Sequence, residues 1–292
     1  MPMREHARRE FLDAVASPAA DLALAALRLA RVEYPELDPA PWLAELDALG
    51  EEARARVARA AELDPGRAAR IAALTRYFYE ERGFTGDREF YEDPRNSFLN
   101  KVLERRAGIP ITLAIVLLEI GRRAEVPLEG VNFPGHFLVR APAGPGEADA
   151  RALLIDPFHG GAIVSERDCQ RLLHAHVGAE AELSGEMFAT AGKREIMMRM
   201  LLNLKRAYVR QHSFPQARDV TELLVRLEPA AVTELRDRGL LSYHLRDLSS
   251  ALRDLETYLR VAAAPDDDEG RQERAQIWDH VKTLRKRLAS FN

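Results

Sequence analysis

The sequence predicts an α+β protein that ends in an all-helical tail, and three observations support this prediction. Residues 4–91 show helical periodicity throughout. A strongly apolar helix then precedes short strand-like runs, which predicts a central buried helix packed on a small antiparallel sheet. The end of the chain is helical again and contains an internal repeat. We therefore expect a helical N-terminal part at residues 1–92, a mixed core at 93–190 and a helical tail at 191–292.

Composition narrows the possible functions. The net charge is -4 with 30% charged residues, whereas nucleic-acid binding needs a clustered basic surface. The start of the chain is charged and has no apolar signal segment, and the longest apolar run, 111–120, is too short to span a bilayer. We expect a cytoplasmic protein with neither nucleic acid nor membrane as its partner. The single cysteine, Cys169, excludes a disulfide within the chain.

The segment 110–122 is predicted to be the central helix. Gly108 suits a left-handed cap on the helix before it, and Pro110 suits a first helical position. The run ITLAIVLLEIGRR is apolar on nearly every side until Glu119, which is typical of a buried helix. Thr112 lies in its first turn, where unpaired N–H groups and the positive end of the helix dipole are concentrated.

Two strand-like runs, GVNFPGHFLVR at 130–140 and LLIDPF at 153–158, flank a polar loop at 141–150. We expect them to form an antiparallel hairpin in which the apolar triplets face each other. The partners in that register are Phe137 and Ile155, Leu138 and Leu154, and Val139 and Leu153. His136 would then lie directly opposite Asp156 on one sheet face.

The tail shows a 34-residue repeat. This shift places Ala217 on Ala251 and Phe214 on Leu248. A period of 34 residues is the length of the helix–turn–helix unit of tetratricopeptide repeats. Such repeats commonly form protein-docking surfaces, so a protein or peptide partner is expected.

A buried helix whose first turn faces a histidine on one strand and an aspartate on the next resembles the arrangement of papain-like acyl transfer, in which the histidine activates a nucleophile and the carboxylate fixes the tautomer of the histidine. The chain order of helix start, histidine and aspartate resembles that of the transglutaminase-like superfamily. The stretches NSFLNKVLERRAGIPITLAIVLLEIGRR, GVNFPGHFLVR and LLIDPFHGG resemble the SirB-type bacterial family. This resemblance covers most of the chain, and it implies a transglutaminase-like core with C-terminal tetratricopeptide repeats. It also implies that His136 and Asp156 match the histidine and aspartate of the triad, and that the protein is regulatory.

The nucleophile departs from that pattern. A papain-like enzyme needs a cysteine at the start of the central helix, whereas this chain has Thr112 there. Because a hydroxyl is much less acidic than a thiol, helix placement alone will not ionise it. Thr112 can instead be a first-turn residue that bonds the backbone. Cys169 follows both His136 and Asp156 in the chain and is expected to be a buried structural thiol.

The sequence leaves more than one role open for several other residues. His136 and Asp156 are either a retained binding pair or a structural hydrogen bond. His159 lies near them in the sequence, and the three residues together suggest a possible metal site. No HxH or HxxxH spacing supports such a site, so neither a metal nor a cofactor is predicted. Asn132 and Arg106 are candidate binding residues, with a surface charge as the alternative for Arg106.

Three functional hypotheses follow. The first is a non-enzymatic or catalytically impaired transglutaminase-like protein that binds a protein or peptide. The second is an amidase-like or peptidase-like hydrolase, or an acyl transferase, that uses Thr112 or a water activated by His136. The third is a fold retained mainly as a scaffold.

Overall fold

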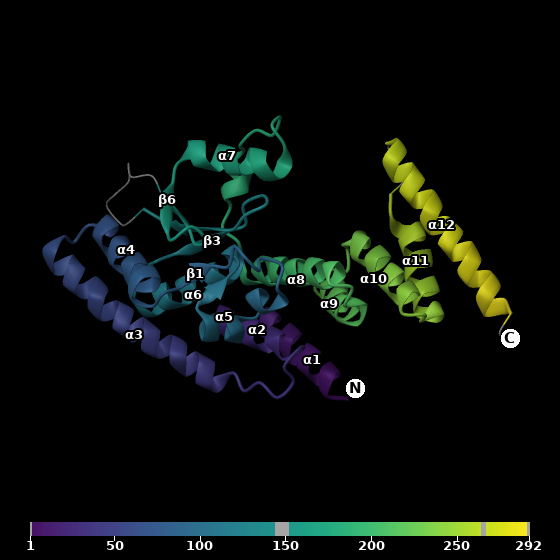
Figure 1. The fold of residues 1–292 in the computed structure, drawn as a ribbon, viewed down its shortest axis with the longest axis horizontal. Helices are drawn as coiled ribbons and strands as arrows, with labels where there is room; N and C mark the ends of the chain where they lie inside the picture. The colour runs from purple at the N-terminus through teal and green to yellow at the C-terminus, as the bar shows by residue number, and fades with distance from the viewer. Residues whose placement is uncertain (1, 144–151, 264–266, 291–292) are drawn as a thin grey trace. The chain divides into compact units, whose positions relative to one another are not determined.

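The computed structural model describes residues 2–143, 152–263 and 267–290, so residues 144–150 of the expected hairpin loop lie outside the described residues. The chain divides into two units, Met1–Met200 and Leu201–Asn292 (Figure 1). The first unit combines helices with a small antiparallel sheet, and the described part of the second is helical. The predicted α+β class with a helical tail is confirmed.

The first unit is built mainly of helices. Those before the four-stranded sheet are α1 (Pro2–Ala16), α2 (Leu22–Ala30), α3 (Ala40–Leu63), α4 (Arg67–Arg76), the π-helical turn η1 (Tyr77–Glu81), the 3-10 turn η2 (Pro94–Ser97), α5 (Leu99–Arg105) and α6 (Pro110–Arg123). Those after it are α7 (Glu166–Val177), the 3-10 turn η3 (Gly185–Phe188) and α8 (Lys193–Arg210), inside which the division between the two units falls.

The helix α6 is the centre of the first unit, as expected. Pro110 is its first residue, and nearly all of its positions are buried. It packs against α2, α3 and α5, and against the sheet. Glu119 is the buried acidic exception, and its Oε1 accepts the backbone N–H of Ala23 at 3.1 Å. The carboxylate thus satisfies a free donor in the first turn of α2.

A parallel pair, β1 (Thr85–Gly86) and β2 (Ala107–Gly108), precedes α6. The expectation of a left-handed cap at Gly108 is wrong: Arg106 takes that conformation, with φ of 55°. The chain turns two residues earlier because Gly108 pairs with Gly86 in the ladder. A Cβ at Gly108 would lie 2.7 Å from Oγ1 of Thr112, so glycine there allows a close approach.

The four-stranded sheet is an antiparallel meander. Its strands are β3 (Glu129–Val131), β4 (Leu138–Ala141), β5 (Leu153–Asp156) and β6 (Ala162–Val164), and they lie in that order.

The expected hairpin exists, but its predicted register is wrong by two residues. Val139 pairs with Ile155 and Ala141 with Leu153. His136 therefore precedes β4 and does not lie directly opposite Asp156. A slip by two residues keeps every side chain on its face of the sheet, so the two residues remain diagonal neighbours within side-chain reach.

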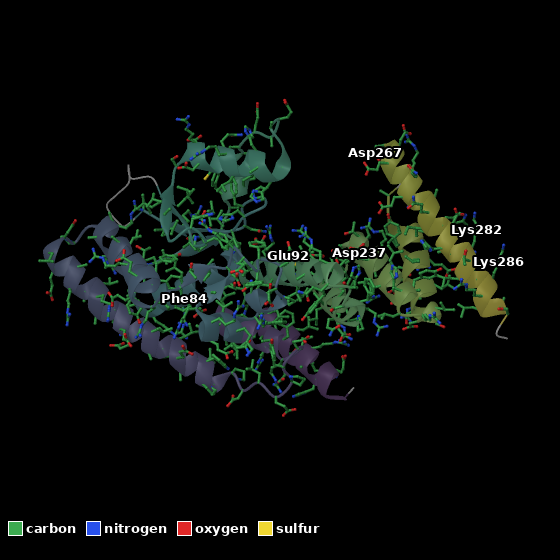
Figure 2. All side chains as sticks on the ribbon, viewed as in Figure 1. Phe84, Glu92, Asp237, Asp267, Lys282 and Lys286 are labelled. Atoms are coloured by element: carbon green, nitrogen blue, oxygen red, sulfur yellow. The ribbon has the colours of Figure 1, made fainter. Side chains whose placement is uncertain are left out.

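The second unit confirms the repeat. The helices α9 (Phe214–Leu227) and α11 (Leu248–Val261) have equal lengths and begin 34 residues apart. Ala217 and Ala251, the equivalent small residues, are fully buried. Between them lies α10 (Val232–His244), and α12 (Asp268–Ala289) packs on α11. Asp267 caps α12 by accepting the N–H of Gly270, and Figure 2 labels it at the start of that helix.

Across the described parts of both units, every helix is too short or too polar to cross a bilayer.

Candidate functional site

The site is built on the turn that follows β5. Asp156 ends the strand, and its Oδ1 accepts the backbone N–H groups of Phe158 at 2.9 Å and His159 at 3.2 Å. Gly160 and Gly161 then adopt φ of 69° and 73°, which lets the chain reverse into β6. The backbone of the turn therefore holds the Asp156 carboxylate in place independently of any other side chain.

His136 reaches this carboxylate from the corner before β4. Its Nε2 lies 2.9 Å from Oδ1 of Asp156, and both residues are buried, with 6% and 3% exposure. The second oxygen, Oδ2, lies 2.8 Å from Nδ1 of His159, whose side chain is 44% exposed. An ionised carboxylate can only accept, so each imidazole donates an N–H to it. One anion thus holds two histidines and its own turn.

The charge of Asp156 is stabilised by these donors. Burial alone would raise the pKa of the carboxyl, but the hydrogen bonds from His136, His159 and the Phe158 backbone outweigh it and hold the pKa at about 2. Nearby, burial and then the Asp156 charge raise the pKa of Tyr79, whose hydroxyl donates to the carbonyl of Pro157 at 3.0 Å. The site therefore carries a fixed anion and a neutral phenol.

The hydrogen bonds of Thr112 go to the backbone and not to His136 or Asp156. The Thr112 side chain has no exposed surface. Its Oγ1 donates to the carbonyl of Asn96 at 2.7 Å, has a further contact to the carbonyl of Ile109 at 3.1 Å, and accepts the Ile109 N–H at 3.2 Å. All of these partners are backbone groups, which makes Thr112 a cap for the start of α6.

Cys169 is a buried thiol, as expected. It is fully covered in a core cluster with Val131, Phe133, Leu138 and Leu173. Burial raises the pKa of the thiol, and the nearby carboxylates raise it further. A thiol in this state is neither ionised nor accessible to a substrate.

The two candidate binding residues lie apart from the histidines in their contacts. Asn132 is exposed, and its Oδ1 accepts Nη1 of Arg199 at 3.2 Å. Arg106 pairs with Glu45 at 2.7 Å and lies over the ring of Phe84, which Figure 2 labels, at 4.8 Å. These contacts link secondary-structure elements and give neither residue a bond to His136 or Asp156.

Two further histidines lie near His136: His159, which the sequence already set beside His136 and Asp156, and His176, which it did not. The ring of His159 lies 6.0 Å from that of His136, and the ring of His176 lies 6.5 Å from it. The signal for His159 was its position three residues after Asp156, in a turn closed by two glycines. His176 carries no such signal, because only the docking of α7 brings it close.

A pocket adjoins this group. Its volume is about 430 Å³, and it is lined by Asp156, His159, strand β6 and the α7 residues Asp168, Arg171 and Leu172. Ile163 of β6 is 53% exposed. The Arg171 guanidinium bonds Asp168. The pocket thus offers an apolar wall beside the Asp156 carboxylate.

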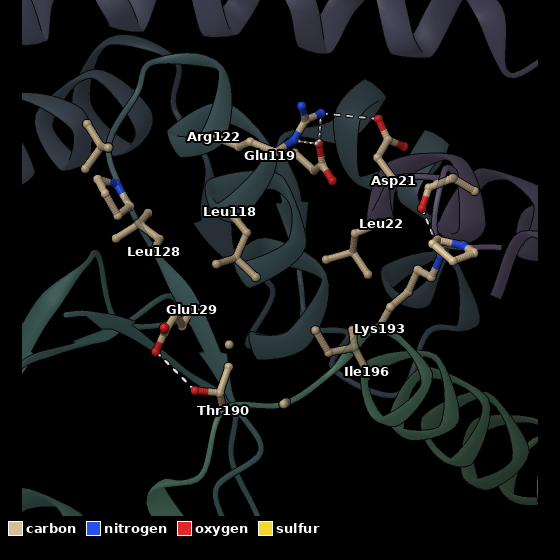
Figure 3. Close-up of a pocket in the computed structure, with 16 residues that line it drawn as sticks. Asp21, Leu22, Leu118, Glu119, Arg122, Leu128, Glu129, Thr190, Lys193 and Ile196 are labelled. Carbon is tan, nitrogen blue, oxygen red and sulfur yellow. Dashed lines mark hydrogen bonds and ion pairs between the residues drawn. The ribbon is translucent and has the colours of Figure 1, made fainter. Parts of the chain in front are cut away.

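Another pocket, of about 540 Å³, lies between α2, α6 and β3 (Figure 3). Its charged side chains already have partners: Arg122 bonds Asp21 and Glu119, and Lys193 donates to the carbonyls of Ala14, Ser17 and Ala20. Because these groups are engaged in holding α1, α2 and α6, the pocket beside His159 is the stronger candidate.

Comparison with known proteins agrees with this architecture. Residues 40–202 match the model of the transglutaminase-like superfamily, which includes α6 and the whole four-stranded sheet. Residues 204–281 match a tetratricopeptide repeat model. The two matches correspond closely to the two units of the structure.

Several relatives match most of the chain. A protein of Xylella fastidiosa named UPF0162 protein is 37% identical over 239 residues, which are 81% of this chain and 82% of the relative. Protein SirB1 of Salmonella typhimurium is 30% identical over 275 residues, 94% of this chain and 96% of the relative. F-box only protein 21 of Mus musculus is 32% identical over 182 residues, 60% of this chain but 28% of the relative. The chain therefore belongs to the transglutaminase-like superfamily and, within it, to the family of the UPF0162 and SirB1 proteins.

Proposed function

We propose that this chain is a catalytically impaired transglutaminase-like protein that acts by binding a protein or peptide segment. The main observation behind the proposal is that the Thr112 hydroxyl is buried and bonded to the backbone. Acyl transfer needs a nucleophile within hydrogen-bond reach of its base. The Thr112 hydroxyl is fully buried and bonded to the backbone of Asn96 and Ile109, and Cys169 is sealed in the core.

The pocket beside Asp156 and His159 supports binding. It is walled by β6, the last strand in the sheet order, whose outer positions Ala162 and Ile163 are exposed. An extended peptide can pair with such an edge and place an apolar side chain against Ile163. The tetratricopeptide tail supplies a second surface of a type that docks proteins.

The binding proposal is tested with the full chain as bait. Wild type, Ile163→Glu and Leu63→Glu are compared by quantitative mass spectrometry of captured proteins. Leu63 is a matched control because it is an exposed apolar residue of α3, outside the pocket lining. We expect a partner that Ile163→Glu depletes at least tenfold and Leu63→Glu leaves unchanged, and a peptide from it should bind purified wild type in calorimetry. Identical partner sets for all three baits would contradict the proposal.

A second experiment addresses catalysis. Amide, ester and glutaminyl substrates are incubated with wild type and with His136→Ala. We expect no turnover that depends on His136. Turnover abolished by His136→Ala would instead favour a hydrolase that uses His136 to activate a water, with Asp156 orienting the ring.

A further inference from the structure

Three potential metal ligands converge at the candidate site although their sequence spacing gives no ligand motif. One ring nitrogen each from His136 and His159 and one carboxylate oxygen of Asp156 lie within 4.8 Å of one another. We propose that these three residues bind one divalent transition-metal cation of the zinc class. The proposal goes beyond peptide binding and does not depend on it.

The distances suit such an ion. Zinc binds imidazole nitrogen and carboxylate oxygen at roughly 2.0–2.2 Å, so adjacent ligand atoms around one ion lie about 3 Å apart. Here Nε2 of His136 lies 2.9 Å from Oδ1 of Asp156, and Nδ1 of His159 lies 2.8 Å from Oδ2, so each ring nitrogen has this separation from one of the two carboxylate oxygens. To bind one ion, the rings must turn so that both nitrogens and a carboxylate oxygen face a common point, and His159, whose side chain is 44% exposed, is the less enclosed of the two histidines.

The ligand types narrow the choice of ion. Two imidazoles and one carboxylate favour zinc and its first-row neighbours, whereas magnesium and calcium prefer oxygen ligands alone. To bind the ion, each ring would present the nitrogen that now faces Asp156 without a proton. A neutral ring would then carry its single proton on the other nitrogen.

The carboxylate is already held in place for this role. The N–H groups of Phe158 and His159 fix Oδ1 of Asp156, and the Tyr79 hydroxyl holds the carbonyl of Pro157. A preorganised anion lowers the cost of arranging the ligands when the cation arrives.

The site also has an open side. Asp156 and His159 both line the pocket of about 430 Å³, so an ion on these residues would face it. Three protein ligands leave at least one position for water or for an oxygen donor from a bound molecule. The site is therefore of the open kind, and a partner's carboxylate is the type of group that could complete it.

The test is metal titration of the full chain after removal of metals with a chelator. Zn²⁺ is followed by calorimetry and Co²⁺ by its visible absorption, for wild type, His159→Gln and His174→Gln. His174 is the matched control, because it is an exposed histidine at the end of α7 with contacts to Gln170 and Ala181. We expect one ion per wild-type chain, at least tenfold weaker binding for His159→Gln, and unchanged binding for His174→Gln.

Two results would overturn the proposal: no stoichiometric binding by wild type, or equal affinity in wild type and His159→Gln. If His159→Gln does not fold, the histidine ring signals of wild type are followed by NMR during the Zn²⁺ titration. Shifts at His136 and His159 together support the site, and shifts confined to other histidines refute it. No peptide is present in these titrations, so their failure would leave the binding proposal standing.

Discussion

Asp156 and His136 are joined by a 2.9 Å hydrogen bond although the ladder does not pair them directly. The bond links the corner before β4 to the end of β5, and the same carboxylate anchors the turn that follows. Both side chains are buried, so the bond is not weakened by solvent. The stability of this region should therefore depend on the ionised state of Asp156.

The first prediction concerns pH. The pKa of Asp156 is about 2 in the folded protein, against an ordinary value of 3.8, so folding favours the ionised form. The stabilisation is fully present above about pH 5 and is lost as pH falls through 3.8 towards 2; its size is roughly 2 kcal/mol. Urea unfolding of wild type and Asp156→Asn, compared from pH 7 to pH 2, measures it.

The difference between the two proteins isolates Asp156 from the other carboxyl groups, which titrate in both. We expect the gap in unfolding free energy to close as pH falls from about 5 towards 2. A gap that stays the same down to pH 2 would mean that the carboxylate charge contributes nothing to folding.

The sequence was sufficient wherever the signal was local. Pro110 marks the start of α6, and the equivalent positions of Phe214 and Leu248 begin α9 and α11. The hairpin register could not be predicted in the same way. Side-chain alternation fixes which face His136 and Asp156 share, but it does not distinguish registers that differ by two residues.

The hydrogen bonding of Thr112 could not be predicted from the sequence either, because it depends on a residue distant in the chain. The first-turn position predicts a bond to the nearby Ile109 backbone. Its shortest bond goes to the carbonyl of Asn96, sixteen residues earlier, and only the folded chain brings that group into place. The sequence therefore shows that a threonine stands where a cysteine is expected, but only the tertiary structure shows which groups the Thr112 hydroxyl bonds.

A second prediction follows for Thr112→Cys. The new thiol should react with a disulfide reagent no faster than Cys169, because both positions are fully buried. Thr283→Cys is the matched control, since Thr283 is an exposed helical threonine that also bonds its own helix backbone. It should react at least a hundredfold faster. A rapid reaction of Thr112→Cys that His136→Ala abolishes would restore the case for acyl transfer.

A third prediction compares two glycines near the site. Gly135 and Gly160 have similar positive φ, 72° and 69°, but different surroundings. A Cβ at Gly135 would lie 2.2 Å from Cβ of His176, whereas nothing lies within 4 Å of one at Gly160. Gly160→Ala should therefore cost about 1 kcal/mol of backbone strain, and Gly135→Ala roughly 3 kcal/mol, because α7 must also move.

Urea unfolding at neutral pH measures both variants. A second readout is the NMR signal of the His136 ring, which should shift in Gly135→Ala and stay in place in Gly160→Ala. Equal losses of stability in the two variants would show that α7 is not packed closely on the corner before β4.

The fourth prediction concerns Glu119, the buried acid of α6. Its carboxylate bonds the Ala23 N–H, Arg122 and Arg123, and the Arg123 side chain is only 11% exposed (Figure 3 shows the Arg122 bond). Glu119→Ala should cost roughly 3 kcal/mol, because it leaves the buried Ala23 N–H without its acceptor and removes one of the carboxylates that pair with the largely buried Arg123 guanidinium.

Arg122→Gln is the control for Glu119→Ala, because it removes the more exposed partner of the same carboxylate. The Arg122 side chain is 55% exposed, so its loss should cost under about 1 kcal/mol, and 1 M salt should reduce that effect further. The effect of Glu119→Ala should be less sensitive to salt, since Glu119 is only 3% exposed and the Arg123 side chain only 11%. Equal, salt-sensitive losses would mean that solvent reaches Glu119 and that α2 is not held to α6 through this carboxylate.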